Sequence, residues 1–205
     1  NNQWEIPRAI INREKVASDL NRYIRKLGNP VSYRFRNGKI WLFFVSVSVG
    51  GWGGSSINMI ESNDDGITWS KTKRLVTSPF FNISNLVRNK PIEYQDGTIG
   101  LPIYHEFLNK FGEIIRLDES GKIIDKIRIS HGNSTLQPTI VAKSDSDALI
   151  FLRNAGDIPR RIVKLETSDS GHSWNKMGAL DLPNPNAAID AISFQNQTLL
   201  VFNNT

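Results

Sequence analysis

The chain has 205 residues, of which 39% are hydrophobic and 22% are charged, and its formal net charge is +5. This length predicts one domain or half of a larger one, and the composition excludes a disordered chain, a coiled coil and a collagen-like fibre. No apolar run is long enough to span a membrane, and residues 1–13 lack the apolar segment of a signal peptide. The positive charges are scattered, which argues against nucleic-acid binding and favours acidic small molecules or acidic glycans as ligands.

The sequence contains no cysteine and three histidines. It therefore has no disulfide, no thiolate metal site and no cysteine nucleophile. With so few histidines we expect no metal ion, and nothing in the sequence calls for a cofactor. The compartment and the oligomeric state stay open, with a secreted or periplasmic location slightly favoured.

The first predicted element is a helix or a loop at residues 13–26, where apolar residues from Val16 to Leu27 recur at helical spacing. The rest of the chain predicts an all-β fold. Short runs rich in Val, Ile, Phe and Trp are separated by turn signals such as Asn37-Gly38. The predicted strands are residues 31–35, 40–49, 99–104, 112–117, 122–129, 139–143, 148–152, 161–167, 191–194 and 198–202.

An internal repeat organises these strands. Each copy begins with a polar residue, usually followed by Pro, and continues as a strand, a turn and a second apolar strand. The copies start at Pro30, Pro91, Pro138 and Asp190, which are 61, 47 and 52 residues apart. About four strands fit into each period, as in one blade of a β-propeller, whereas a β-sandwich would show no such period.

We therefore predict a β-propeller of four-stranded blades. Three full blades are expected at about residues 30–78, 86–129 and 137–180, followed by two inner strands of a fourth blade. An outer edge strand is expected at residues 4–11.

A second repeat fits the pattern S/T-x-D-x-G-x-S/T-W. Its copies are residues 62–69 and 167–174, which lie 105 residues or two predicted blades apart, and a weaker remnant without Trp lies at 118–121. In such a turn the Asp and hydroxyl side chains bond backbone amides, Gly permits a positive φ, and Trp packs the hairpin onto the blade. We expect these residues to be structural and assign them no chemistry.

The two octapeptides resemble the Asp boxes, or neuraminidase repeats, of the sialidase superfamily. Other segments resemble its bacterial predicted-neuraminidase branch, and together they cover residues 28–204. These segments are Gly28-Asn29-Pro30, Gly50-Gly51-Trp52, Arg88-Asn89-Lys90-Pro91, Leu101-Pro102-Ile103-Tyr104-His105-Glu106, Leu136-Gln137-Pro138, Phe151-Leu152-Arg153 and Asn184-Pro185-Asn186.

The resemblance implies six blades in a complete propeller, of which this chain would hold three to four. We therefore expect residues 1–205 to be a single, partial propeller domain, since an open set of blades leaves unpaired edges that natural sheets avoid. The alternative is a ring that closes with unusually few blades.

In a propeller, the starts of the innermost strands and the adjoining loops crowd around one end of the central axis. Asn29, Arg88, Lys90, Gln137 and Asp190 should meet there, near the segments 104–106, 153–154 and 203–204. We assign substrate binding to Arg88, Lys90, Gln137, Arg153, Trp52 and His105.

Arg88 and Arg153 would grip a carboxylate through paired hydrogen bonds, with Lys90 as a third cation. The Arg-Ile-Pro motif typical of sialidases is absent. Both arginines could instead pair with neighbouring acids. Trp52, among glycines, could stack on a sugar ring or fill a gap between blades.

The catalytic candidates are Tyr104, Glu106 and Asp190. Tyr104 and Glu106 lie two residues apart on one strand and project to the same side, while His105 points to the other. The resemblance implies a Tyr nucleophile activated by Glu, because a neutral phenol avoids repulsion from an anionic substrate. Asp190 is the candidate general acid, a role that needs a pKa raised by burial or by neighbouring acids.

These residues favour a sialidase-like glycoside hydrolase that removes a terminal, acidic sugar from a glycan. The first alternative is a non-catalytic propeller that binds a glycan or a protein through amides and apolar groups. The second is a polysaccharide lyase, in which Tyr104, His105 and Lys90 would supply the base and the neutralising cation.

Overall fold

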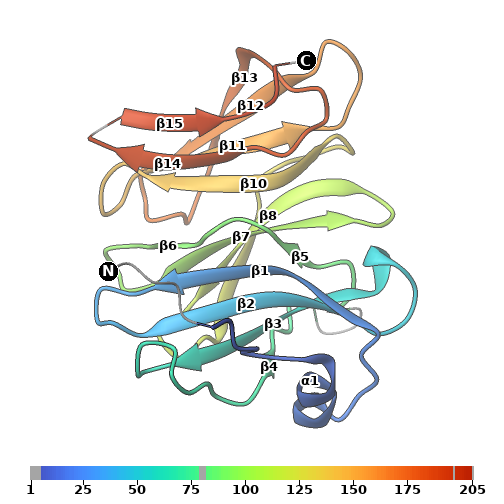
Figure 1. Cartoon of the computed structure of the whole chain (residues 1–205). Coiled ribbons are helices and arrows are strands. Elements are labelled where there is room, and N and C mark those ends of the chain that lie inside the picture. The colour runs from blue at the N-terminus through green and yellow to red at the C-terminus, as the bar shows by residue number, and fades with distance from the viewer. Residues whose placement is uncertain (1–5, 79–81, 196, 205) are drawn as a thin grey trace.

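The computed structural model describes residues 6–78, 82–195 and 197–204. It contains one short α-helix, α1 (Arg13–Leu20), and antiparallel strands arranged in separate sheets that follow one another along the chain (Figure 1). The all-β prediction is confirmed.

The first three sheets hold thirteen of the strands. The first sheet contains β1 (Lys26–Arg34), β2 (Ile40–Val47), β3 (Ser55–Ser62) and β4 (Lys73–Arg74). The second contains β5 (Leu86–Val87), β6 (Ile92–Glu93), β7 (Ile99–Glu106), β8 (Lys110–Leu117) and β9 (Ile123–Arg128). The third contains β10 (Thr135–Ala142), β11 (Ala148–Asn154), β12 (Arg161–Thr167) and β13 (Asn175–Pro183).

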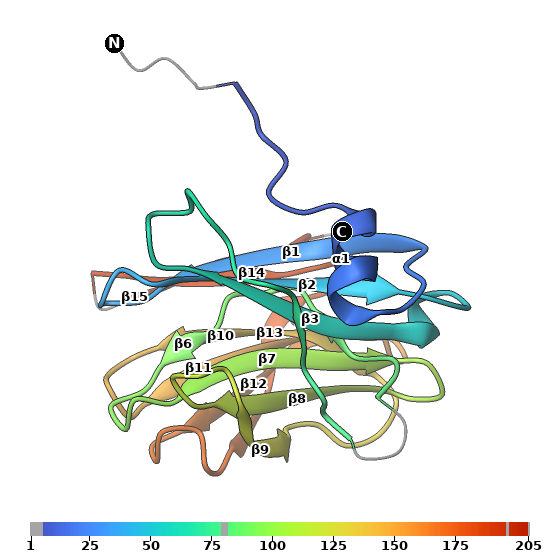
Figure 2. The ribbon, with the colours of Figure 1, turned by 90° about the horizontal axis from the view of Figure 1, so that it is seen from below.

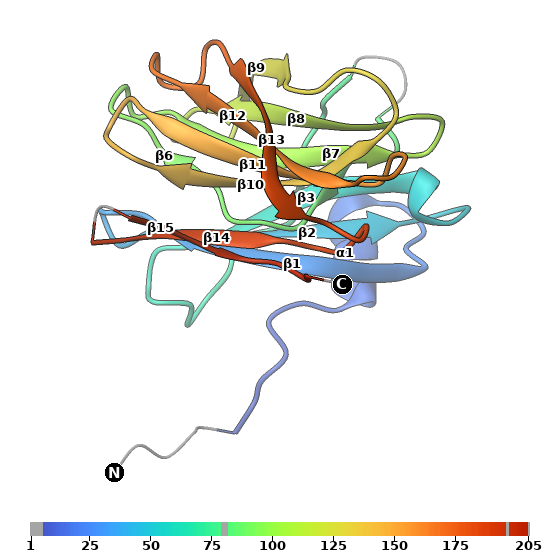
Figure 3. The same cartoon turned by 90° about the horizontal axis from the view of Figure 1, so that it is seen from above.

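The last sheet pairs β14 (Asp190–Phe194) with β15 (Gln197–Val201). Figures 2 and 3 show β1, β14 and β15 along one side of the molecule, with β8, β9 and β12 toward the other. The sheets therefore follow the predicted period within a few residues.

Three parts of the sequence prediction are wrong. The helix ends at Leu20 because Asn21 adopts a left-handed conformation (φ 49°), and the chain then enters β1. Residues 6–11 form no strand, and residues 4 and 5 of the expected edge lie outside the described chain. The glycine-rich segment around Trp52 forms a short 3-10 turn, η1 (Trp52–Gly54), and is followed by β3, a strand that the sequence did not predict.

The proline of each repeat marks a β-bulge rather than a strand start. β1 and β10 begin before it, and their registers shift between Gly28 and Val31 and between Leu136 and Thr139. Proline has no amide hydrogen to continue the ladder, and the preceding residues, Asn29 and Gln137, take positive φ values of 49° and 48°. In the second sheet the same interruption separates β5 from β6, which both pair with β7.

Apolar clusters join each sheet to the next. The largest cluster includes Trp41 and Phe43 of the first sheet and Leu101 and Leu117 of the second. A second cluster packs the second sheet on the third, and a third packs the third sheet on β14 and β15. Adjacent sheets therefore bury one another's faces, which fixes the strand ends relative to each other.

The two octapeptide turns share one hydrogen-bond pattern. The Asp64 carboxylate accepts from the Thr68 amide (2.8 Å) and hydroxyl (2.6 Å), and Asp169 does the same with Ser173 at 2.9 and 2.6 Å. Ser62 and Thr167 also donate to these carboxylates at 2.7 Å. These hydrogen bonds within each turn agree with the structural role predicted for the side chains.

The same hydrogen bonds predict acid sensitivity. Those from Thr68 and Ser62 lower the pKa of Asp64 to about 2. Burial alone would raise the pKa of Asp169, but hydrogen bonds from Ser173 and Thr167 outweigh it and lower the pKa to about 2. A lowered pKa in the folded state stabilises the fold above the usual value of 3.8, and this contribution disappears as the pH falls toward 2.

We therefore expect the free energy of unfolding to fall between about pH 4 and pH 2, measured by urea denaturation at a series of pH values. Asp169→Asn should lower stability at pH 7 and flatten this dependence. Asp157→Asn is the control, because Asp157 is exposed and makes no hydrogen bond within the described chain. An unchanged acid dependence in Asp169→Asn would contradict the prediction.

Candidate functional site

One end of the sheets carries most of the predicted site residues. β1 and β10 begin at this end, and β7 and β11 finish there, because neighbouring strands within each sheet are antiparallel. In Figure 1 the arrows of β1, β10 and β14 point to the left, and this end of the sheets is where these strands begin, at the right. The bulges at Asn29 and Gln137 lie here as well.

At this end, a chain of polar contacts links the second sheet, the third sheet and the segment between β13 and β14. Gln137 Nε2 lies 3.5 Å from the Tyr104 hydroxyl, and Arg153 Nη1 donates to Gln137 Oε1 at 3.0 Å. Arg153 Nε donates to Asn186 Oδ1 at 3.0 Å. Tyr104 and Gln137 are both buried. The structure thus brings together three predicted residues from β7, β10 and β11.

Tyr104 is a buried phenol whose neighbours shift its pKa in opposite directions. Burial is the largest influence and raises its pKa, while the hydrogen bond from Gln137 lowers it. The Glu106 carboxylate raises the pKa further, and Arg88 and Asn29 lower it. The net shift is upward, so the hydroxyl is neutral near pH 7 and loses its proton only when a base accepts it. Glu106, two residues along β7, is the carboxylate whose charge acts on this phenol.

Arg153 keeps hydrogen-bonding capacity for an anion. Of the five N–H donors of a guanidinium group, two are bound by Gln137 and Asn186. Within the described residues Arg153, Arg88 and Lys90 form no ion pair, so the alternative in which the arginines pair with neighbouring acids is not observed there. Arg88 and Lys90 are exposed.

Asp190 lies apart from this network. It is exposed at the start of β14, and its Oδ1 accepts a hydrogen bond from Thr139 Oγ1 of β10 at 3.1 Å. Asp190 therefore lacks the burial that was expected to suit it to the role of general acid. Asp190 therefore joins the last sheet to the third, and no described contact connects it to Tyr104.

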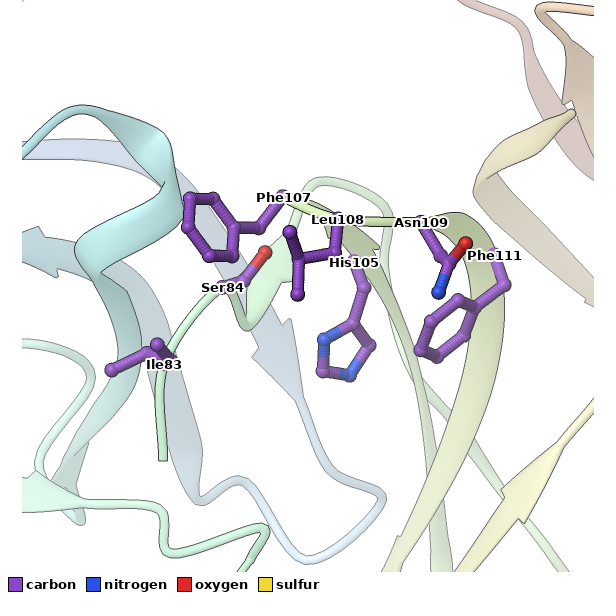
Figure 4. A pocket seen from close by; sticks show the side chains of 7 residues that line it. All are labelled: Ile83, Ser84, His105, Phe107, Leu108, Asn109 and Phe111. Carbon is purple, nitrogen blue, oxygen red and sulfur yellow. The ribbon is translucent and has the colours of Figure 1, made fainter. Parts of the chain in front are cut away.

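His105 points to the opposite face of β7, as the strand alternation predicts. Its Nε2 lies 2.8 Å from Glu113 Oε2, and its ring stacks on Phe111 with centroids 4.5 Å apart. It lines a separate cavity of about 300 Å³ with Ile83, Phe107 and Leu108 (Figure 4). The structure does not bring His105 to the Tyr104 network, so its predicted contact with substrate there is not supported.

Trp52 lies beside the bulge of β1. Its ring touches Gly28, where an added Cβ would lie 3.1 Å from the indole, and Lys26 Nζ sits 4.0 Å from the ring centroid. The side chain is 40% exposed. Trp52 thus closes part of a gap beside β1 and still presents a face to solvent, so both expected roles remain compatible with its position.

Two side chains that contact the predicted site residues or their strands were not singled out from the sequence. Asn89 is buried, and its Nδ2 donates to the Pro138 carbonyl of the β10 bulge at 2.9 Å. Asn186 orients Arg153. Both lie in segments that carried the family resemblance, but nothing in their local sequence indicates which residue they contact.

Within the described residues no group of three or more His, Cys, Asp or Glu side chains could hold a metal ion. The described part of the chain also contains no helix long and apolar enough to cross a membrane.

The chain belongs to the BNR repeat-like domain family, whose match covers residues 1–205. No curated protein sequence matches it significantly. Among solved structures, it is similar to the Hadza microbial sialidase Hz136, with a TM-score of 0.75 and 18% identity over 98% of this chain and 44% of that one. The resemblance to sialidase-like BNR proteins is confirmed.

Two other solved structures share the fold. A K499G mutant of the NanB sialidase from Streptococcus pneumoniae has a TM-score of 0.59 at 16% identity, over 86% of this chain and 30% of that one. An alpha-L-arabinanase from Penicillium chrysogenum, complexed with arabinobiose, has a TM-score of 0.62 at 10% identity, over 85% of this chain and 58% of that one. At such identities these likenesses establish the fold alone, and this chain spans about half or less of each sialidase.

Proposed function

We propose that this chain carries part of a sialidase-like glycoside hydrolase that removes a terminal, acidic sugar from a glycan. The observation that carries the proposal is the Tyr104–Gln137–Arg153 network, with Arg88 and Glu106 beside the phenol. We also propose that the successive sheets are blades of a six-bladed propeller, a reading supported by the similarity to longer sialidases.

In this proposal, Arg153 binds the carboxylate of the sugar through its remaining N–H donors, and Arg88 and Lys90 add positive charge at the rim. Gln137 and Asn186 hold the guanidinium in place. Glu106 accepts the proton of Tyr104 as the phenolate oxygen attacks the anomeric carbon, and the leaving alcohol takes a proton from a general acid. Asp190 stays the candidate acid only if it turns from Thr139 toward the site.

The second candidate is a propeller that binds an acidic glycan without cleaving it. The observation that favours it is the abundance of amides around Arg153, namely Gln137 and Asn186, together with the exposed position of Asp190 away from Tyr104. The lyase alternative loses support, because His105 and Tyr104 lie on opposite faces of β7.

A turnover screen tests the proposal. The protein, as this chain and as any longer natural form, is assayed with fluorogenic sialosides and with acidic and neutral glycosides. We expect cleavage of an acidic glycoside, lowered about 10²- to 10⁴-fold in Glu106→Gln and weakened mainly through KM in Arg153→Ala. Glu119→Gln, in a turn at the other end of the sheets, should retain full turnover. Binding of the acidic sugars without turnover by folded protein would support the binding propeller instead.

A further inference from the structure

A second cavity lies between the second and third sheets, away from the Tyr104 network. Its volume is about 440 Å³, within the range of about 300–1,000 Å³ that is typical of small-molecule pockets. Its walls come from the β9–β10 segment, β11, β12 and β13. Leu152 and Asn154 line it, whereas Arg153 between them points to the other face of β11.

Three basic side chains surround this cavity: Arg128, His131 and Lys176. None of the described residues that line it is acidic, and within the described chain none of the three forms an ion pair. Arg128 is held in place, because its Nε donates to the Ser130 carbonyl at 3.0 Å and its guanidinium carbon lies 3.8 Å from the Phe111 ring centroid. The rim therefore presents positive charge without compensation.

Two of the lining residues carry a buried donor without a partner in the described structure, namely Thr135 Oγ1 and Trp174 Nε1. Thr135 is only 6% exposed. The matching tryptophan of the first octapeptide turn differs, because Trp69 Nε1 donates to the Gly66 carbonyl at 3.0 Å. A buried donor without an acceptor is costly, so a ligand oxygen that accepts from either group would be stabilising.

The floor of the cavity is apolar. It is formed by Ile129, Leu152, Val163, Leu165 and the Trp174 ring. An indole beside aliphatic side chains suits the apolar C–H face of a sugar ring, while the donors and cations suit its hydroxyl and carboxylate oxygens.

We propose that this cavity is a second ligand site that binds a small acidic sugar carrying one carboxylate. Lys176 and Arg128 bind the carboxylate, Thr135 and Trp174 donate to ring or hydroxyl oxygens, and the apolar floor packs against the ring. The site is separate from the proposed catalytic centre, since its residues face the second sheet and Arg153 does not.

The test uses D-glucuronate as the probe and D-glucose as its neutral counterpart. Binding is followed by NMR on the isotope-labelled protein, through the indole N–H signal of Trp174. We expect glucuronate to shift this signal in a saturable way and glucose to bind about tenfold more weakly or less.

Variants separate this site from the other possibilities. Lys176→Met should weaken glucuronate binding about tenfold, and Thr135→Val several-fold. Lys164→Met is the matched control, because Lys164 lies between Val163 and Leu165 and points to the opposite face of β12. Arg153→Ala should leave the Trp174 response unchanged, since the readout does not depend on the proposed hydrolase activity.

An absent Trp174 response would overturn the proposal, as would equal binding of glucose and glucuronate or an unaffected Lys176→Met variant. A response lost in Arg153→Ala would also overturn it, because the sugar would then bind at the Tyr104 network.

Discussion

Tyr104→Phe is expected to abolish glycoside cleavage, lowering kcat by about 10³-fold or more, while the protein still binds its acidic sugar. The substitution removes one oxygen atom and keeps the buried ring. The hydroxyl makes a long contact of 3.5 Å with Gln137 and one further side-chain contact, with Asn29, so we expect its loss to disturb the fold little. The measurement is kcat with the glycoside identified in the turnover screen, alongside sugar affinity by calorimetry.

Tyr33→Phe is the matched control. Tyr33 is a half-buried phenol whose pKa, like that of Tyr104, is raised by burial, but it lies on β1 near Glu93, at the other end of the strand from Asn29. Its variant should retain wild-type turnover. If Tyr104→Phe retained activity within a few-fold, another nucleophile or a direct attack by water would replace the proposed mechanism.

The second large effect concerns stability, where Gly171→Ala should cost about 3 kcal/mol. Gly171 has φ +77°, and an added Cβ would overlap Tyr94 Oη and lie 2.7 Å from Tyr94 Cζ. The Tyr94 ring also packs closely on Gly100, where an added Cβ would lie 2.7 Å from the ring, so we expect the ring to have little room to move. Backbone strain and overpacking therefore act together.

The first octapeptide turn provides the control. Gly66 occupies the same position with φ +80°, but an added Cβ would meet only Trp69 at 3.4 Å. Gly66→Ala should therefore cost about 1–2 kcal/mol, from backbone strain alone. Urea denaturation measures both free energies, and equal losses in the two variants would show that Tyr94 contributes nothing.

A double-mutant cycle with Tyr94→Phe isolates the contact. The Tyr94 hydroxyl is buried and has no hydrogen-bond partner within the described chain, so its removal alone should change stability little. In the Gly171→Ala background the same change should recover part of the loss. If Tyr94→Phe recovers none of the lost stability, the loss comes from the backbone of the turn alone.

The sequence predicted features that depend on local chemistry. Glycines and prolines marked the turns and bulges, and the repeat period placed the sheet boundaries, because these residues restrict their own backbone wherever the chain goes. Strand alternation alone put Tyr104 and Glu106 on one face of β7 and His105 on the other. The repeat also suggested that Gln137 and Arg153 would meet, since the inner strand starts and the adjoining loops of a propeller crowd around one end of its axis.

Strands with weak local signals were missed. β3 carries Ser55, Ser56 and Asn58 on buried positions, so its sequence looked like a loop although it lies in the middle of the first sheet. Its polar groups are accommodated there, as when Asn58 Nδ2 donates to Ser46 Oγ at 2.8 Å. Burial of such a strand depends on neighbours that its own residues do not specify.

The sequence by itself therefore determined the all-β class, the period of the sheets and the side of each strand that a residue faces. Only the tertiary structure decided the partners: Glu113 for His105, Asn186 for Arg153 and Thr139 for Asp190. It alone also revealed the cavity beside Trp174. These contacts join residues that are distant in the chain, and they form because apolar faces of neighbouring sheets pack together, which fixes the strand ends to within hydrogen-bond distance.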